Sequence, residues 1–545
     1  MHASFLINLG SPTVSTYENS LAATAYSLKR GKEIGAKGVV IHTGSAVDES
    51  HVEKAWQQIH EGVMPILNNL KEDDPWLLLE PTAGQGQSLV KKLDDLTKYF
   101  AAAGHSLPLP VVTATVFATW FGSETILGIP ATFLKEGLGG IVSDPFGSSM
   151  CLILVGLFFA RHLYNRRMLT IGDFYREKYG RTVEVLITLC IVVSYLGWVA
   201  AQIKALGLVF NVVSEGYLTQ QMGMIIGAAS VLIYTLFGGM WSVAITDFIQ
   251  MIVIVLGMLY IGSLISDQTG GVMVVVQHAA DSGALNFWPD WNLASVLGFI
   301  AALVTMMLGS IPQQDVFQRI TSSRNVDTAV RGAVLGGVLY FIFAFVPLFL
   351  AYSATLIDSS MVEKHLYVDS QMILPNLILN HSPIYAQMIF FGALLSAIMS
   401  CSSATLLAPS VSFAENIVKG FFKHLSDQSL LKIMRITVLC FTCFVTFFAL
   451  NSKLTIFQMV ESAYKVTLVA AFVPLAFGVY WSRANTLGGL LAVIFGLATW
   501  IICEVLAPDA TVPPQLAGLF ASLIGMLVGG FVPAGRLKPA NSSKV

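Results

Sequence analysis

A carboxylate interrupts an otherwise apolar stretch near the start of the hydrophobic part of this chain. The stretch runs from Thr113 to Thr125, and Gly122, Ser123 and Glu124 break it just past its middle. Polar breaks in a membrane helix persist where they line a protein cavity, and a carboxylate there is costly enough to indicate function. We therefore assign Glu124 and the adjacent Thr125 to solute binding. The alternative is a glycine kink in which Glu124 pairs with a neighbouring helix.

A second stretch is rich in small hydroxyl and thiol side chains. Between Ser396 and Thr405, six of the ten residues are Ser, Thr or Cys. Hydroxyls and freed backbone carbonyls offer oxygen ligands to a hard cation. Ala397, Ser400 and Cys401 have the spacing of one helix face. Close helix packing through small residues explains the same pattern equally well.

Two further polar stretches join apolar segments. The first, 234–250, contains a Gly-Gly turn and Asp247. Asp247 could cap the following helix, and the spacing alone slightly favours this role. It could also lie on the exit route of an ion, and this is the functional role that we assign to it. The second stretch, Ile311 to Arg319, is either a functional link on the cytoplasmic side or an ordinary solvated loop.

The composition is that of a membrane protein. Of 545 residues, 55% are hydrophobic and 12% are charged, whereas soluble proteins carry about 25% charged residues. The formal net charge of -2 gives no indication of a nucleic-acid partner. Membrane lipid is the expected surrounding partner.

Apolar segments long enough to span a membrane fill the chain after Leu109. There are twelve: 110–129, 147–165, 183–213, 222–237, 243–265, 292–312, 330–354, 385–415, 433–450, 457–480, 487–506 and 515–533. This number excludes a soluble helical core, because too few polar faces remain for water. We expect an all-α polytopic membrane domain over 110–533 and a tail over 534–545.

Basic residues in the connections predict the orientation. If the first segment starts in the cytoplasm, 17 Lys and Arg residues lie in inside loops and the tail. Only Lys135, Lys364 and Lys453 lie outside. A multi-pass protein of the cell membrane with both termini in the cytoplasm is therefore expected.

Residues 1–104 have a different pattern. Short apolar runs alternate with polar helical stretches, which is typical of a parallel sheet. The expected strands are Phe5–Asn8, Val39–Thr43 and Trp76–Glu80, and the expected helices are Ser15–Gly35, Asp48–Leu70 and Gln87–Ala103. This part is interpreted as a small cytoplasmic α/β fragment.

The polar stretches of the membrane part resemble the sodium:solute symporter family. The shared positions are Gly238, Gly239, Thr246, Asp247, Gln250, Asp315, Gln318 and Arg319. The resemblance covers roughly residues 110–510. It implies a five-plus-five inverted-repeat transporter core with about 12 transmembrane helices, the repeats running from about 110 to 265 and from about 292 to 480.

The same resemblance implies a sodium site between the first and eighth core helices. Its ligands fall on the backbone carbonyls of Ala118, Phe121 and Ala397 and on the side chains of Ser400 and Cys401. The family normally has Ser or Thr at the last position. A thiol is a poor ligand for a hard cation, so a weakened sodium affinity is expected.

Within the family, two stretches are similar to choline-transporter-like and proline-transporter-like members. These are Ala118–Gly122 and Ile311–Asp315. The expected solute is therefore a small organic molecule, choline-like or an amino acid. The family's usual extra helix before the core has no counterpart here, which agrees with a cytoplasmic N-terminus.

Residues 2–88 resemble a second family, the endonuclease IV class of zinc-dependent barrel enzymes. The matching stretches are His2–Gly10, Val40–Ser45 and Leu79–Gly86. That family's zinc ligands correspond to His2, His42 and Glu80 here, and two imidazoles with a carboxylate suit zinc. Three strand-helix units cannot close an eight-stranded barrel, and the later metal ligands are absent.

Three functions are therefore weighed. The first is sodium-coupled symport of a small organic solute by alternating access. The second is a membrane-tethered zinc-dependent endonuclease acting on apurinic DNA, and the third is a sensor with a transporter-like core. A fold fragment does not carry function by itself, so the first is predicted, with no enzyme activity and sodium rather than zinc as the ion. The fragment is then a remnant of a gene fusion or an artefact of gene calling.

Overall fold

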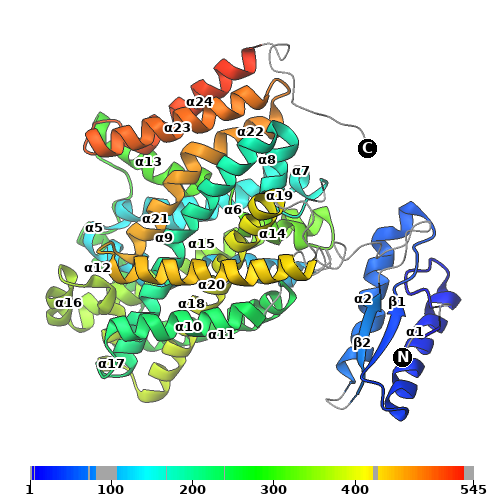
Figure 1. Ribbon diagram of the computed structural model, residues 1–545. Coiled ribbons are helices and arrows are strands. Elements are labelled where there is room, and N and C mark those ends of the chain that lie inside the picture. The colour runs from blue at the N-terminus through cyan, green and yellow to red at the C-terminus, as the bar shows by residue number, and fades with distance from the viewer. Residues whose placement is uncertain are drawn as a thin grey trace. The chain divides into compact units, whose positions relative to one another are not determined.

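The computed structural model divides the chain into two compact units, Met1–Ser106 and Leu107–Val545 (Figure 1). Residues described are 3–4, 7–70, 74–80, 107–166, 168–237, 240–421 and 427–532. Each unit is considered by itself.

The first unit contains a pair of parallel strands. Strand β1 (Gly38–His42) pairs in register with β2 (Trp76–Glu80), and α1 (Val14–Glu33) packs on β1. The helical pieces η1 (Glu49–His51) and α2 (Val52–Asn68) lie between the two strands in sequence. Alternate residues of β1 are buried because successive side chains of a strand point to opposite faces.

Two of the three predicted strands are present in this unit. Val39–Thr43 and Trp76–Glu80 correspond to β1 and β2. The predicted strand Phe5–Asn8 lies partly outside the described residues, and its described part is not in a strand. The predicted helix Gln87–Ala103 lies wholly outside them. Within the described residues the unit therefore has a two-stranded sheet, which is marginal on its own.

The second unit consists of helices. Up to Asp281 they are α4 (Leu109–Trp120), η3 (Glu124–Gly128), α5 (Ile129–Glu136), η4 (Leu138–Ile141), η5 (Val142–Gly147), α6 (Ser148–Leu154), η6 (Val155–Phe159), α7 (Ala160–Tyr164), α8 (Ile171–Tyr179), α9 (Arg181–Val213), α10 (Gln220–Phe237), α11 (Met240–Thr269) and α12 (Val272–Asp281). From Leu293 onward they are α13 (Leu293–Gly309), α14 (Gln314–Ser322), α15 (Val326–Ile357), α16 (Ser359–Leu366), η7 (Ser370–Met372), α17 (Ile373–His381), α18 (Ile384–Ser412), η8 (Phe413–Val418), α19 (Lys419–Phe421), α20 (Asp427–Asn451), α21 (Ile456–Thr467), η9 (Leu468–Phe472), α22 (Val473–Tyr480), α23 (Thr486–Leu506) and α24 (Pro514–Phe531).

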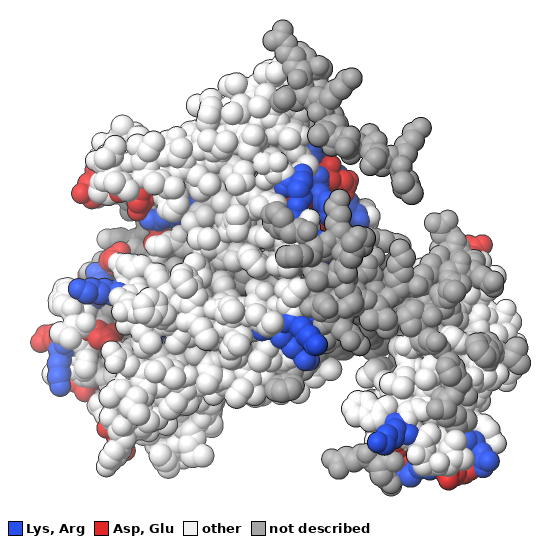
Figure 2. Space-filling model, viewed as in Figure 1, with Lys and Arg blue, Asp and Glu red and all other residues white. Residues whose placement is uncertain are grey.

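Many of these helices are long and apolar enough to cross a membrane. Nine pass by length and composition among the described residues, or up to eleven when each of two bent pairs counts as one span. Each of the twelve predicted segments overlaps at least one helix, although the count of twelve is finer than this result. On the face of this unit that Figure 2 shows, the described surface is largely uncharged, with Lys, Arg, Asp and Glu in a few small groups.

Two bends place irregular backbone inside the helical unit. Helix α4 and the segment Glu124–Glu136 meet at 54°, and α13 meets α14 at 45°. Helix α11 packs against both α4 and α18, while α9 packs against α18 and α21. The first bend therefore lies where α4, α9, α11 and α18 come together.

Candidate functional site

The bend after α4 releases a backbone carbonyl. In an unbroken helix the Ala118 carbonyl would accept the Gly122 N–H, but that N–H donates to the Trp120 carbonyl at 3.1 Å instead. Phe121, which follows the last residue of α4, has φ −85° and ψ 74°, so its carbonyl leaves the helical direction. Both carbonyls can therefore serve as oxygen ligands for a cation.

Helix α18 presents its hydroxyl-rich face to this bend. The Ser400 hydroxyl oxygen lies 3.5 Å from the Ala118 carbonyl oxygen. A Cβ added to Gly122 would lie 2.9 Å from the Cys401 sulfur. Gly122 is thus needed for the close approach of α18, and Cys401 faces the bend.

Asp247 reaches the same place from α11. Its side chain is fully buried, and its Oδ1 accepts the Ser400 hydroxyl. Its Oδ2 has no hydrogen-bond partner. Because Asp247 lies two turns inside α11, which begins at Met240, the interpretation as a helix cap is wrong.

The structure thus brings most of the predicted sodium ligands together. Ala118, Ser400 and Cys401 meet at the bend, Phe121 is part of it, and Ala397 is fully buried one turn before Cys401 on α18. Asp247, predicted on an exit route, contacts Ser400 directly and supplies a carboxylate to the same cluster.

Replacing Cys401 by Ser tests whether its side chain is a ligand. Sodium prefers oxygen donors, so Cys401→Ser should lower the sodium concentration for half-maximal uptake about two- to five-fold. Sodium-dependent uptake in vesicles is the measurement, with thermal stability as a control for folding. An unchanged or higher sodium requirement in a folded variant would exclude Cys401 as a ligand.

Glu124 is the first residue of η3 and is held by two side chains of α9. The Trp198 indole N–H donates to Glu124 Oε1 at 3.2 Å, and the Gln202 amide donates to Oε2 at 2.7 Å. The other end of the Gln202 amide accepts the Ser123 N–H at 3.1 Å. Glu124 is 2% exposed, and no Lys, Arg or His in the described part of the chain forms an ion pair with it.

Thr125 joins a second buried carboxylate. Its hydroxyl lies 3.0 Å from the Tyr340 hydroxyl, which donates to Asp144 Oδ1 at 2.6 Å. Asp144, in η5, is 3% exposed. The predicted solute residue Thr125 is therefore linked through Tyr340 to Asp144, which the sequence analysis missed, whereas Glu124 is held separately by Trp198 and Gln202.

Three aromatic rings pack beside Glu124. The ring centroids of Trp120 and Trp198 are 5.8 Å apart, those of Trp198 and Tyr464 are 5.6 Å apart, and those of Trp120 and Tyr464 are 6.2 Å apart. The Tyr464 hydroxyl is buried without a hydrogen-bond partner. Aromatic faces attract organic cations, and a nearby carboxylate strengthens that preference.

The stretch from Ile311 to Arg319 is not a solvated loop. Residues Gln314–Ser322 form the buried helix α14, in which Asp315 is 0% and Arg319 is 2% exposed. The Tyr195 hydroxyl donates to Asp315 Oδ1 at 2.5 Å and accepts the Asp315 N–H at 2.9 Å. The alternative of an ordinary solvated loop is therefore wrong.

The predicted zinc residues lie in the first unit. His2 is outside the described residues, and the side chain of Glu80 is not described. His42 lies opposite Glu80 in the register of the two strands. In the part of the chain that the structure describes, no three His, Cys, Asp or Glu residues form a group that could hold a metal.

The two units match different families of known proteins. Residues 99–496 match the sodium:solute symporter family, and residues 1–111 match the family described as xylose isomerase-like TIM barrel. The human high affinity choline transporter 1 is 28% identical over 425 residues, covering 74% of this chain and 70% of that protein. A probable endonuclease 4 of Streptomyces avermitilis is 46% identical over 121 residues, which are 22% of this chain and only 39% of that protein.

Two solved structures share the fold of the helical unit. A sodium-coupled sialic acid symporter in a substrate-bound outward-open state has a TM-score of 0.67 and 19% identity, covering 81% of this chain and 93% of that chain. MhsT in complex with L-phenylalanine has a TM-score of 0.50 and 15% identity, covering 77% of this chain and 97% of that chain.

Proposed function

Because the chain belongs to the sodium:solute symporter family, we propose that the solute it carries is a small organic cation of the choline type. The chain is a multi-pass membrane transporter that couples solute movement to sodium, and not an enzyme. The observation that carries the solute class is Glu124, a buried carboxylate held only by neutral donors. A buried charge is costly without an opposite charge, which a cationic solute supplies.

The aromatic cluster beside Glu124 supports the same class. Trp120, Trp198 and Tyr464 are side chains of the kind from which aromatic cages for a quaternary ammonium are built. An amino acid has a carboxylate of its own, which Glu124 would repel. Several relatives are choline transporters, and choline is a cation, which supports a cationic solute for this chain.

The proposed sodium site lies at the bend after α4. Its ligands are the Ala118, Phe121 and Ala397 carbonyls with the Ser400 and Cys401 side chains, and Asp247 neutralises the ion's charge. Sodium bound there would hold α4 and α18 together and keep the solute residues Glu124 and Thr125, three to four residues further along the chain, in place. Ion and solute binding would be coupled in this way.

For the architecture, we propose twelve spans arranged as two inverted repeats, from about 110 to 265 and from about 292 to 480. The basic residues of the connections, 17 against three, support cytoplasmic N- and C-termini. In this orientation Lys135, Lys364 and Lys453 mark the outer side of the cell membrane.

Uptake into vesicles tests the proposed solute class. Purified full-length protein in lipid vesicles should accumulate radiolabelled choline when sodium is imposed outside, but not when potassium replaces it. Unlabelled choline should inhibit this uptake at least about ten times more strongly than proline, because choline has a net positive charge and proline is a zwitterion. Sodium-driven uptake that proline competes for and choline does not would overturn the cation assignment while leaving symport intact.

The N-terminal unit is expected to be dispensable for transport. Leu107 belongs to the helical unit, where its N–H donates to the Ser322 carbonyl at 3.0 Å and its carbonyl accepts the Arg324 N–H at 3.1 Å. Deletion of residues 1–104 preserves these bonds and should leave uptake within about two-fold of the full chain, after correction for the amount inserted. A larger loss in a correctly inserted protein would assign this unit a role in transport.

A further inference from the structure

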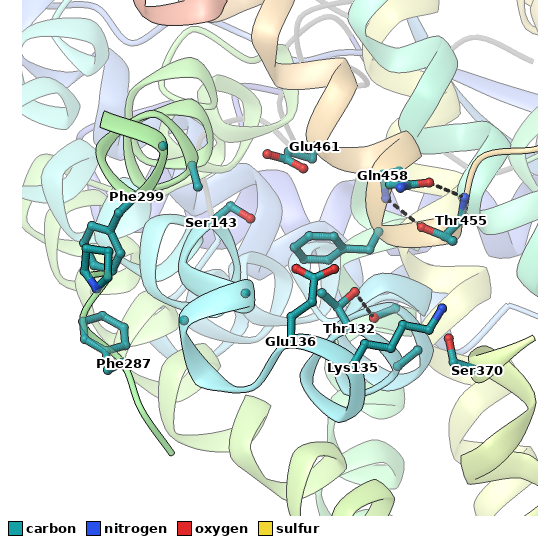
Figure 3. Close-up of a pocket in the computed structure, with 18 of the residues that line it drawn as sticks. Thr132, Lys135, Glu136, Ser143, Phe287, Phe299, Ser370, Thr455, Gln458 and Glu461 are labelled. Atoms are coloured by element: carbon teal, nitrogen blue, oxygen red, sulfur yellow. Dashed lines mark hydrogen bonds between the residues drawn. The ribbon is translucent and has the colours of Figure 1, made fainter. Parts of the chain in front are cut away.

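A cavity of about 500 Å³ lies in the helical unit, outside the site described above (Figure 3). Its walls come from η3, α5, η4, η5, α13, η7 and α21, together with the segments before α13 and α21. This volume lies within the range of small-molecule sites. None of the predicted sodium or solute residues lines it.

The lining of this cavity carries unbalanced negative charge. Its ionisable residues are three carboxylates, Glu136, Asp290 and Glu461, and one ammonium, Lys135, a formal sum of −2. In the described part of the chain, none of these four side chains forms an ion pair or a hydrogen bond. Outside the lining, Lys465 and Glu504 act on Glu461 with opposite charges. The net negative charge of the lining therefore remains, and such a charge raises the local concentration of cations.

The two glutamates come from different helices and face the same space. Figure 3 shows Glu136, from α5, and Glu461, from α21, projecting from separate walls toward the space between them. A Cβ added to Gly140 would lie 2.4 Å from the Glu136 Cβ and 2.8 Å from its Oε2. The absence of a side chain at Gly140 therefore lets the Glu136 carboxylate lie against the backbone.

Aromatic residues form another wall of the cavity. Phe287 and Phe299 both line it, with ring centroids 5.3 Å apart and nearly perpendicular planes. Phe457 lines it from α21. Carboxylates opposite aromatic rings favour an organic ammonium, because a strongly hydrated metal ion gains little from the rings.

Elements that line the cavity continue directly to the deeper site. Gly128 lines the cavity, and Glu124 lies one turn away on η3. Glu461 lines it, and Tyr464 of the aromatic cluster lies one turn further along α21. The cavity and the Glu124 site are thus joined through shared helices.

We propose that this cavity is a second binding site for organic ammonium ions, one helical turn outside the Glu124 site, with Glu136 and Glu461 as its charged residues. Its function in uptake rests on the proposed solute class, because it would collect the solute before the deeper site opens to it. Binding of a small ammonium ion at the cavity does not depend on which solute is transported.

Charge-selective labelling of a cysteine in the cavity tests the proposal without knowledge of the solute. Ser295 lines the cavity, so Ser295→Cys places a thiol there. We expect a cationic methanethiosulfonate reagent to modify this thiol at least about ten-fold faster than an anionic one. Tetramethylammonium chloride should slow the labelling, and sodium chloride at the same ionic strength should not. The full-length chain with Ser295 intact is the control for labelling of the native cysteines.

Neutral variants connect the effect to the two glutamates. Glu136→Gln and Glu461→Gln in the Ser295→Cys chain should each lower the cation preference about three-fold and weaken protection by tetramethylammonium. Glu363→Gln, an exposed change on α16 outside the cavity lining, should alter neither. Equal rates for the two reagents, protection by sodium as good as by tetramethylammonium, or a preference that survives both neutral variants would each overturn the proposal. None of these results depends on whether choline is transported.

Discussion

Asp247→Asn should raise the sodium concentration for half-maximal uptake at least about ten-fold, which corresponds to about 1.4 kcal/mol of binding free energy. Asp247 is fully buried, its Oδ1 accepts the Ser400 hydroxyl, and its Oδ2 has no hydrogen-bond partner. The buried Arg319 acts on this charge, and a cation at the adjacent carbonyls would be its second partner. Removal of one partner of a buried charge pair costs about 2–5 kcal/mol, so ten-fold is a lower bound.

A comparison of two serines on α18 assigns the effect to the bend. Ser400→Ala removes the hydroxyl that lies between Asp247 and Ala118, and should raise the sodium requirement several-fold. Ser402→Ala is the matched control, because the Ser402 hydroxyl donates to the Ile398 carbonyl of its own helix. The Ser400→Ala and Asp247→Asn effects should not add, since both side chains act on one ion in the proposed site. If Ser400→Ala and Ser402→Ala leave sodium dependence equally unchanged, the sodium site is placed wrongly.

The sequence was sufficient to predict the helical unit because membrane spans have a strong and local signal. Each predicted apolar segment overlaps a helix, and the break at Gly122–Glu124 coincides with the bend of 54°. Both follow from the cost of polar groups in lipid, which acts on each segment separately. The same cost identified Glu124 as a functional candidate before any partner was known.

The partners of these residues could not be predicted, because they depend on which helices pack together. Asp144 falls between the predicted segments 110–129 and 147–165 and was not identified as a candidate, yet it is buried and bonded to Tyr340. Asp315 was placed in a polar link, although α14 carries it into the interior. In both cases the sequence signal was an Asp in a short link between two apolar segments.

The two local interpretations that failed did so for a related reason. A helix cap at Asp247 and a solvated loop around Asp315 are reasonable when only neighbouring residues are considered. Helix α11 begins at Met240, seven residues before Asp247, and α14 continues the path of α13 after a bend. Tertiary packing, which no single stretch of sequence encodes, therefore decides the role of each of these carboxylates.

Glu124→Gln should reduce the apparent affinity for a quaternary ammonium solute about a hundred-fold, or about 2.7 kcal/mol. Glutamine has nearly the same shape and its Oε1 can still accept the Trp198 indole N–H, but its Nε2 cannot accept the Gln202 amide, so the change removes the charge and one hydrogen bond. The loss follows from the 2–5 kcal/mol that a buried charge contributes when its partner is a bound cation.

A neutral isostere of the solute separates the loss of charge from damage to the site. 3,3-Dimethylbutanol has a tert-butyl group where a quaternary ammonium has its trimethylammonium, and its weak inhibition of uptake should be the same in Glu124→Gln and in the unchanged chain. Trp198→Phe keeps a ring but removes the indole N–H that donates to Glu124, so it should weaken ammonium binding less, by about ten-fold. A Glu124→Gln variant that retains its affinity for the ammonium solute would show that Glu124 supports the bend instead of binding the solute. Such a result would favour Asp144, the buried carboxylate linked to Thr125 through Tyr340, as the partner of the solute's charge, and Asp144→Asn is the corresponding test.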